Sequence, residues 1–391
     1  MAQRTPGAAR RIALAAALLS GLSWASASAQ AAGPAEVATF DLRHWSEPLD
    51  TPAGFDKASR AALLVYASTL HRLPPRDEAQ WLADLRIKSL NRASLDQWLD
   101  EERARVLRNY QRASADCPAG VNHSRPAIRP SVAGDLIAWR SGLSAYSHTY
   151  LAEQMRLAAL FPKVSSEIAT FGAHEGSGDA LADREFFLTF DDGPSKAGGN
   201  TDATLAMLAQ QGKSATFFVL GENLQARLDR HGAAALADLY AGQCVASHGW
   251  EHRSHARWDG WQDSVRTTAA LLRNALPEAS LALFRPPYGQ RTADSGPFFA
   301  AQGVQVALWN IDSQDWQRQL DADAIGNRIL ALMLIKRHGV LLFHDVHGKA
   351  GSALPRVFAA LGEAVEREPG LGFIGRADER GDLGDAVELL D

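Results

Sequence analysis

Positive charge is scarce in this chain. Its 391 residues include 40 lysines and arginines against 45 acidic residues, so the formal net charge is −5. Removal of the first 29 residues would take away three arginines and no acids, and the net charge would then be −8. An excess of acid opposes binding to nucleic acid or to an anionic membrane surface. We therefore expect neither partner, and the sequence indicates no particular protein partner.

Cysteine is rare, and long apolar runs are lacking after the N-terminus. Cys117 and Cys244 are the only cysteines. They could form one disulfide in an oxidising compartment, but the sequence does not show that they lie close together. No segment after the first thirty residues has the length and apolar character of a membrane-spanning helix. We therefore do not expect an integral membrane protein once the N-terminal segment is removed.

The first 29 residues resemble a secretory signal peptide. Three arginines precede an apolar run over 12–22, and small residues over 25–29 offer an Ala-x-Ala cleavage site. The apolar run is short for a bilayer, so we favour cleavage over an uncleaved anchor. The pair Arg10-Arg11 lacks the flanking residues of a twin-arginine signal. We expect an exported protein, either periplasmic or secreted.

The first half of the remaining chain has helical patterns. One helix face carries five large apolar residues, namely Leu136, Trp139, Leu143, Tyr146 and Tyr150. The stretch Ser94–Gln97 resembles a capping box that opens another helix. This half contains no internal repeat and no cluster of acids with histidines. We expect a mostly α-helical N-terminal domain over 30–180 that is supportive or substrate-facing rather than catalytic.

The pattern changes after a polar, glycine-rich stretch at 172–182. Seven short apolar runs follow, and helical segments such as 202–211, 263–275 and 322–336 lie between them. The runs are 185–190, 215–220, 244–247, 281–284, 304–309, 340–343 and, weakly, 372–375. Alternation of strands with helices predicts a parallel sheet. We therefore expect an α/β domain over 181–391, either a barrel or a doubly wound sheet.

Polar residues gather just after five of these runs. The five clusters are Asp191-Asp192; His248, His252 and His255; Arg285–Gly289; Asp312, Asp315 and Trp316; and His344, Asp345 and His347. Each cluster alone has an ordinary explanation as a turn, a loop or a helix start. In a (β/α) barrel, however, the carboxyl ends of the strands share the rim where active sites lie. Five such clusters together favour a catalytic site.

The residue types in these clusters suit metal-assisted hydrolysis. Two imidazoles and one carboxylate form a site for a divalent metal, with zinc as the first choice. Spacing alone allows either His248 with His252 or His252 with His255. Of the two adjacent acids, Asp191 and Asp192, one would bind the metal and the other would take a proton from metal-bound water. A histidine on the opposite side would protonate the leaving group.

The clusters also form five motifs in a fixed order. They are Thr189–Pro194, His248–His252, Arg285–Gly289, Asp312–Trp316 and Leu342–Asp345. With these motifs, residues 185–375 resemble the NodB-homology polysaccharide deacetylases, carbohydrate esterase family 4. The stretch Lys213–Asn223 is similar to the second strand of that family. One departure is Gly249, where the family usually has serine or threonine, and we expect this change to be tolerated.

The resemblance implies a distorted (β/α)7-type barrel and metal-dependent removal of N-acetyl groups from amino-sugar polymers. By motif position, Asp191 would be the base that acts on metal-bound water. Asp192, His248 and His252 would bind the metal, which would be Zn²⁺ or, alternatively, Co²⁺, Ni²⁺ or Mn²⁺. The polymer stays open among peptidoglycan, poly-N-acetylglucosamine and chitin-like chains. The alternatives are an O-acetyl esterase on xylan-like glycans and a glycan-binding protein with a vestigial site.

The resemblance also implies roles for the residues around the metal. Arg285 would hold the base, and the backbone N–H of Tyr288 would stabilise the oxyanion. Asp315 would orient His344, the acid that protonates the departing amine. The pocket for the substrate would be lined by Trp316, Leu342, Pro286 and Pro287.

Overall fold

The computed structural model describes residues 36–115 and 134–366, which lie within one compact unit. Three predictions fall outside these residues: the signal peptide over 1–29, the cysteine partner Cys117 and the weak strand over 372–375. Cys244, the other cysteine of the proposed disulfide, is buried at the start of a strand. Within the described residues, no helix is long and apolar enough to cross a membrane.

The first part of the chain is helical, as predicted. Its elements are η1 (Leu42–His44), α1 (Pro52–His71), α2 (Glu78–Asp84), α3 (Arg92–Ala113) and α4 (Gly134–Leu160). The side chains of Trp139, Leu143, Tyr146 and Tyr150 are buried, which confirms four of the five residues predicted for the apolar face of α4. The side chain of Leu136 lies outside the described residues. Helix α4 ends directly before the Phe161-Pro162 pair because proline cannot continue the backbone hydrogen bonding of a helix.

The prediction of a capping box at Ser94–Gln97 is wrong. Helix α3 begins three residues earlier, and its N-cap is Asn91, whose side-chain oxygen accepts a hydrogen bond from the backbone N–H of Ser94 at 3.1 Å. Asparagine is as good an N-cap as serine, so the earlier residue takes the position and Ser94 falls within the first turn.

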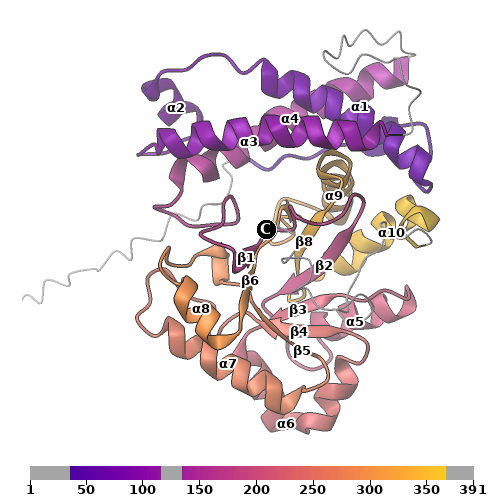
Figure 1. Cartoon of the computed structure of the whole chain (residues 1–391). Helices are drawn as coiled ribbons and strands as arrows, with labels where there is room; N and C mark the ends of the chain where they lie inside the picture. The colour runs from indigo at the N-terminus through magenta and orange to yellow at the C-terminus, as the bar shows by residue number, and fades with distance from the viewer. Residues whose placement is uncertain (1–35, 116–133, 367–391) are drawn as a thin grey trace, which may run out of the picture. The chain divides into compact units, whose positions relative to one another are not determined.

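The second part of the chain forms one curled, parallel sheet (Figure 1). Its strands are β1 (Glu175–Gly176), β2 (Phe186–Asp191), β3 (Thr216–Val219), β4 (Cys244–Ser247), β5 (Ser280–Phe284), β6 (Gln305–Ala307), β7 (Ile311–Asp312) and β8 (Gly339–His344). The strand order is β1-β6-β5-β4-β3-β2-β8-β7, and every pair is parallel. Six predicted strands are therefore confirmed within an incomplete barrel of eight.

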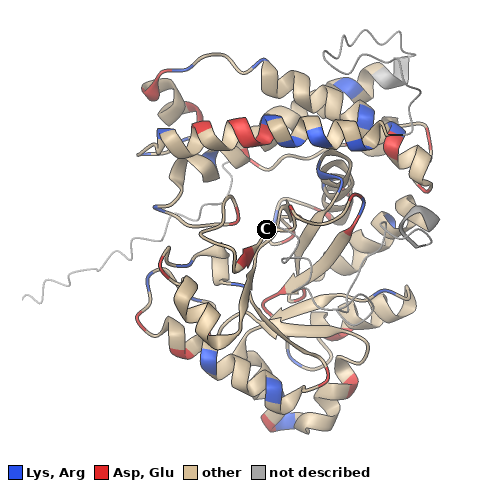
Figure 2. Ribbon diagram, in the orientation of Figure 1, with Lys and Arg blue, Asp and Glu red and all other residues tan. Residues whose placement is uncertain are grey.

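Helices connect the strands and cover the sheet. They are α5 (Asn200–Gln210), α6 (Gly221–Leu239), α7 (Trp261–Ala275), α8 (Gly296–Gln302), α9 (Ala322–Lys336) and α10 (Ala350–Glu366), with a short 3-10 turn η2 (Pro287–Gly289). Figure 2 shows that the charged residues lie mainly on helices and loops and that the sheet itself carries few. Strand β1 precedes residue 181, so the sheet begins within the stretch predicted as a domain boundary.

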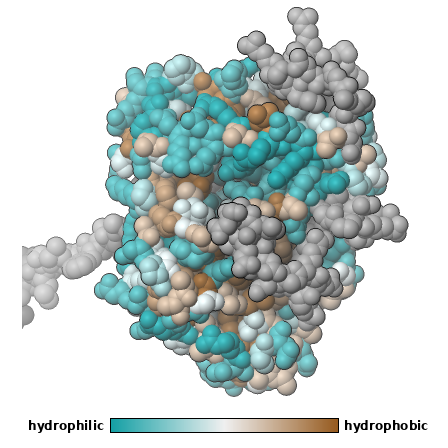
Figure 3. Space-filling model, in the orientation of Figure 1, coloured by the Kyte–Doolittle hydropathy of each residue, from teal (hydrophilic) through white to brown (hydrophobic). Residues whose placement is uncertain are grey.

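Helix α9 explains why the helical region packs where it does. All its residues from Arg328 to Lys336 are buried, and those at 329–335 are all apolar, so this part of the helix needs cover on every side. The sheet covers one side, and helices α1 and α3 contact another (Figure 1). The outer side of α3 is hydrophilic (Figure 3). The helical region thus completes the core around α9.

Buried polar contacts fix this packing. Arg328 of α9 forms an ion pair with Glu153 of α4 at 2.7 Å, and both side chains are almost fully buried. The side-chain amide of Asn109 on α3 donates to the last carbonyl oxygens of α9, at 3.0 and 2.9 Å. Each bond satisfies a polar group that would otherwise be buried without a partner. These contacts hold the helical region against α9.

Candidate active site

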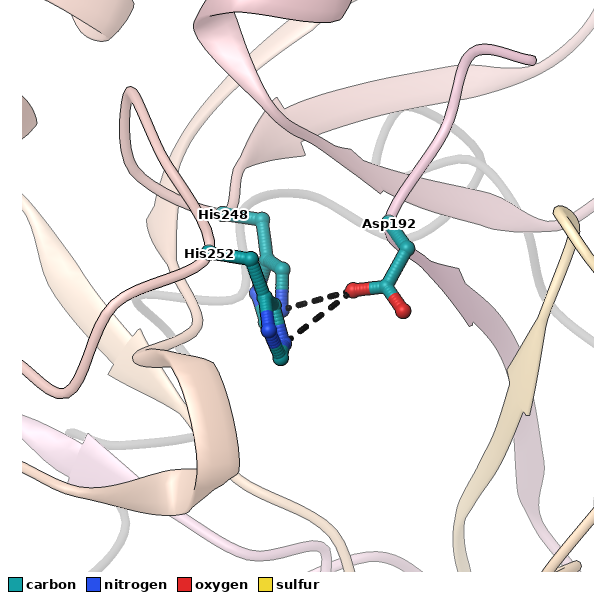
Figure 4. Close-up of side chains that lie close together, drawn as sticks. All are labelled: Asp192, His248 and His252. Atoms are coloured by element: carbon teal, nitrogen blue, oxygen red, sulfur yellow. Dashed lines mark ion pairs between the residues drawn. The ribbon is translucent and has the colours of Figure 1, made fainter. Parts of the chain in front are cut away.

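The two adjacent acids lie at the carboxyl end of β2 and point in different directions. Asp191 is the last residue of the strand, and Asp192 follows it with a left-handed backbone, φ +78°. Oδ1 of Asp191 accepts a hydrogen bond from Nη1 of Arg285 at 2.8 Å. Oδ1 of Asp192 instead lies 3.3 Å from Nε2 of both His248 and His252 (Figure 4). The two carboxylates therefore have different partners.

Arg285 follows β5 and is completely buried beneath the site. Its guanidinium bonds Asp191, the hydroxyl of Thr189 at 2.7 Å, and the carbonyl oxygens of Ala307 and Leu308 at 3.0 and 3.2 Å. It also lies over the ring of Phe218, 4.0 Å from the centroid. This set of partners compensates for burial of the positive charge and fixes the orientation of the Asp191 carboxylate.

Asp192, His248 and His252 are placed like the ligands of a small metal ion. Ligands about 2.0–2.1 Å from a tetrahedral ion are about 3.3–3.4 Å from one another, close to the two distances from Asp192. Oδ1 of Asp192 is buried and accepts no hydrogen bond from the described residues. A buried oxygen without a donor, facing two imidazole nitrogens, fits a cation. The three residues therefore fit a divalent metal.

The protonation of the two histidines also fits a metal. Nδ1 of His248 lies 2.8 Å from the carbonyl oxygen of Arg285, which can only accept, so Nδ1 carries the proton and Nε2 presents a lone pair. Burial lowers the pKa of His252 to about 4, which keeps its imidazole neutral.

His255 lies outside this cluster because both of its nitrogens have other partners. Nδ1 is 2.9 Å from the carbonyl oxygen of Arg253, and Nε2 is 3.1 Å from Oγ of Ser264. That hydroxyl also accepts the backbone N–H of Trp250 at 2.7 Å. Gly249 has φ +85°, and a Cβ there would lie 2.7 Å from the His255 ring. The ring thus fills the space beside Gly249, where a side chain would not fit.

His344 and Asp315 form a second pair on the other side of the cluster. Nδ1 of His344 donates to Oδ1 of Asp315 at 2.7 Å, and the backbone N–H of His344 donates to Oδ2 at 2.9 Å. Burial opposes protonation of His344, but Asp315 and then the acids Asp192 and Asp191 outweigh it and raise the pKa to about 10. A protonated imidazole at neutral pH can deliver a proton.

The remaining predicted residues surround these groups. Tyr288 has a left-handed backbone, φ +60°, and its half-exposed ring lies edge-to-face on His252 with centroids 4.5 Å apart. Trp316 is exposed, and Leu342 is buried in β8 two residues before His344. Pro286 and Pro287 are both buried in the loop that carries Tyr288.

Residues at the start of α6, which none of the five motifs includes, join the two loops of the cluster. The backbone N–H groups of Leu220, Gly221 and Glu222 donate to the carbonyl oxygens of Gly193, Gly249 and Trp250 at 2.9, 2.9 and 3.1 Å. The side-chain amide of Asn223 donates to the carbonyl oxygen of Asp192 at 3.0 Å. The resemblance covers the stretch Lys213–Asn223 only as a strand, so it does not indicate these contacts.

Comparison with known proteins gives consistent matches. A family model described as polysaccharide deacetylase matches residues 179–307. A chitooligosaccharide deacetylase of Bradyrhizobium sp. (strain ANU 289) is 33% identical over 182 residues, which cover 46% of this chain and 78% of that protein. A peptidoglycan-N-acetylglucosamine deacetylase of Bacillus cereus is 28% identical over 218 residues, covering 54% of this chain and 76% of that protein.

A further relative is named for a different glycan. The bifunctional xylanase/xylan deacetylase of Cellvibrio japonicus is 34% identical over 167 residues, which cover 40% of this chain and 22% of that protein. The family model extends over the strands that lead to Asp191, Asp192, His248 and Arg285. The Bradyrhizobium enzyme is matched at one-third identity over most of its length. This chain belongs to the polysaccharide deacetylase family.

Proposed function

We propose that this site removes N-acetyl groups from an amino-sugar polysaccharide by hydrolysis of the amide bond. One observation carries the proposal. A buried carboxylate–guanidinium pair, an Asp–His–His cluster and an aspartate-oriented histidine meet at one edge of the sheet. Together these groups can take a proton from water, stabilise charge on a carbonyl oxygen and protonate a leaving nitrogen.

Asp192, His248 and His252 would hold the metal. We propose Zn²⁺, with Co²⁺, Ni²⁺ and Mn²⁺ as alternatives, because the donors are mixed nitrogen and oxygen and their spacing suits a small ion. When bound, the ion would activate a water molecule as the nucleophile and polarise the acetyl carbonyl.

Asp191 would be the general base. Arg285 holds its Oδ1, and its Oδ2 lies 3.8 Å from Nε2 of His248, on the side of the metal cluster. From there the carboxylate can accept a proton from the attacking water, while Arg285 keeps it from turning toward the metal. The base would thus stay beside the cluster without becoming a ligand.

His344 would be the general acid. Its pKa, raised to about 10, keeps the ring protonated at neutral pH, and Asp315 fixes the ring through Nδ1. As the C–N bond breaks, His344 gives a proton to the nitrogen, so the products are acetate and a free amine. The backbone N–H of Tyr288 would stabilise the negative charge that forms on the carbonyl oxygen.

The acetyl group would bind between one exposed apolar side chain and one buried apolar side chain. Trp316 and Leu342 would contact the methyl group, since one flanks Asp315 and the other precedes His344 on the same strand. Pro286 and Pro287 are buried, and they would shape the substrate side of the Tyr288 loop chiefly by restricting its backbone.

The names of the relatives support the proposed substrate class. Two of them are named for chitooligosaccharide and for peptidoglycan N-acetylglucosamine, and both substrates carry N-acetyl groups. Poly-N-acetylglucosamine carries the same N-acetyl amide. We propose an exported enzyme that acts on one of these polymers, with export directed by the N-terminal segment over 1–29.

A substrate panel tests the proposal and its rivals. Purified protein loaded with zinc is incubated with chitin oligomers, peptidoglycan, poly-N-acetylglucosamine and acetylated xylan, and the released acetate is measured. Release from the amide substrates with new primary amines supports the proposal. Release from acetylated xylan alone would make the chain an O-acetyl esterase, an activity that the Cellvibrio relative's name favours. Binding without release would indicate a glycan-binding protein with a vestigial site.

A further inference from the structure

The loop that carries Tyr288 has a backbone that needs outside support. Tyr288 and Gly289 are both left-handed, with φ +60° and +65°. A left-handed backbone is disfavoured for a residue with a side chain, so neighbouring contacts must hold Tyr288 in this conformation. The direction of its N–H depends on the same backbone angles.

The side chain of Arg291 binds this loop. Its side chain is buried, and all five of its N–H donors are used. Nε and Nη2 bond the two carboxylate oxygens of Glu175 at 2.9 and 2.5 Å. Nη1 bonds the carbonyl oxygens of Gly289 and Ser166 at 3.0 and 2.6 Å, and Nη2 also bonds that of Ala169 at 2.9 Å. One guanidinium therefore ties the loop to residues 166–175.

The same segment also forms hydrogen bonds with the backbone of Arg291. The hydroxyl of Ser165 accepts the backbone N–H of Arg291 at 2.9 Å and donates to its carbonyl oxygen at 2.6 Å. Gly289 packs so closely that a Cβ there would lie 3.2 Å from both Ser166 Cα and Glu167 N. Residues 165–175 thus lie directly under the Tyr288 loop.

We propose that the segment 165–176 is a brace for the oxyanion loop, and that Glu175 and Arg291 are positioning residues for the Tyr288 N–H. The proposal rests on the role given to Tyr288 under the proposed function. The brace lies before residue 179, where the family match begins, and before the predicted domain boundary at 180/181. The deacetylase domain of this chain would accordingly begin upstream of both.

The charge of Glu175 is the part of the brace that can be tested alone. Its side chain and that of Arg291 are almost fully buried, so no water can replace the carboxylate. Glu175→Gln keeps the size of the side chain but leaves a buried guanidinium without a counter-charge. Arg291 should then turn toward solvent and release its bond to the Gly289 carbonyl oxygen.

A matched control is available at the opposite end of the sheet. Glu102 on α3 is equally buried and forms ion pairs with Arg105 and with Lys336, which precedes β8 at its amino end. It also accepts the hydroxyl of Tyr66 at 2.8 Å. Glu102→Gln removes the same charge from a buried network that makes no hydrogen bond or ion pair with the described residues of the Tyr288 loop, so it reports what general destabilisation does.

The experiment compares Glu175→Gln, Glu102→Gln and wild type by hydrogen–deuterium exchange of peptides that span 286–291. On a soluble chitin oligomer, kcat, KM and metal content are measured in parallel. We expect faster exchange and a kcat at least about tenfold lower for Glu175→Gln, with KM and metal content within about twofold of wild type, because misplaced oxyanion donors weaken the transition state alone. Glu102→Gln should keep wild-type exchange in 286–291.

Ser165→Ala decides the matter if Glu175→Gln does not fold, because it removes one hydroxyl and no charge. It should raise exchange in 286–291 and lower kcat in the same direction by a smaller factor. Unchanged exchange in both brace variants, or equal changes in Glu102→Gln, would overturn the proposal. Failure of wild type to release acetate from any substrate would refute the proposed function instead, since the exchange comparison needs no substrate.

Discussion

Asp191 and Asp192 offer the sharpest test of which acid is the general base and which is a metal ligand. Asp191 and Asp192 are neighbours in sequence, yet one bonds Arg285 and the other faces two histidines. Each of the substitutions Asp191→Asn and Asp192→Asn replaces a carboxylate with an amide of nearly the same size. They should nevertheless fail for different reasons, since the first removes a base and the second removes a charged metal ligand.

The structure sets the size of each effect. Loss of a general base typically costs about 10²–10⁴-fold in rate, or about 3–5 kcal/mol in the barrier. Asp191→Asn also unpairs the buried Arg285, which should lower the free energy of unfolding by about 3–5 kcal/mol. Its metal content should stay at the wild-type level. Loss of a residue that only contacts a metal ligand typically weakens metal binding about 10–100-fold. Asp192→Asn removes a charged ligand itself, so it should weaken metal binding by more than this.

The assay measures metal content by mass spectrometry after dialysis, beside acetate release and thermal unfolding. Asp56→Asn serves as control, because Asp56 pairs with the buried Arg337 at 2.7 Å, ahead of β8 and away from the site. This control should lower the unfolding temperature while metal and turnover persist. Equal metal loss in Asp191→Asn and Asp192→Asn, or wild-type turnover in Asp191→Asn, would refute the reasoning.

Three further predictions follow from the geometry. His344→Ala should lose most turnover and keep its metal, whereas His347→Ala should stay active; equal loss in both would reassign the acid. Asp315→Asn removes the main group that raises the pKa of His344 to about 10. Because the acid must be protonated to act, the basic limb of the kcat–pH profile should move to lower pH by about one unit or more. A basic limb that does not move would contradict the pairing of His344 with Asp315. A fragment that starts at Leu181 lacks β1, Glu175 and the helices that cover α9, so it should be poorly soluble, and a folded, active fragment would count against this packing.

Much of the fold could be predicted because buried parallel strands are continuous apolar runs. The runs at 185–190 and 340–343 are of this kind, and they form most of β2 and β8. Strands β1 and β7 have two residues each, too few to form a pattern, and they were missed. The start of α3 was misplaced because Asn91 and Ser94 are both good N-caps, and only the three-dimensional contact decides between them.

The site could be predicted where its residues lie within short motifs, and not where partners are distant. Spacing could not choose between His252 paired with His248 and His252 paired with His255. The contacts of His255 with Arg253 and Ser264 supply that choice. The bond between Arg291 and Glu175 joins residues 116 positions apart, so no local pattern indicates it. A long-range ion pair becomes visible only when the chain has folded.

The central claim is that a metal held by Asp192, His248 and His252 enables hydrolysis of an N-acetyl group. The most direct test strips the enzyme with a chelator, adds Zn²⁺ back in steps, and counts acetate and new primary amines from a chitin oligomer at each step. The account predicts no turnover without metal, a rise that levels off at about one equivalent per chain because the described residues offer one such cluster, and one amine for every acetate. Full turnover in the stripped enzyme, or acetate released without amine, would contradict it.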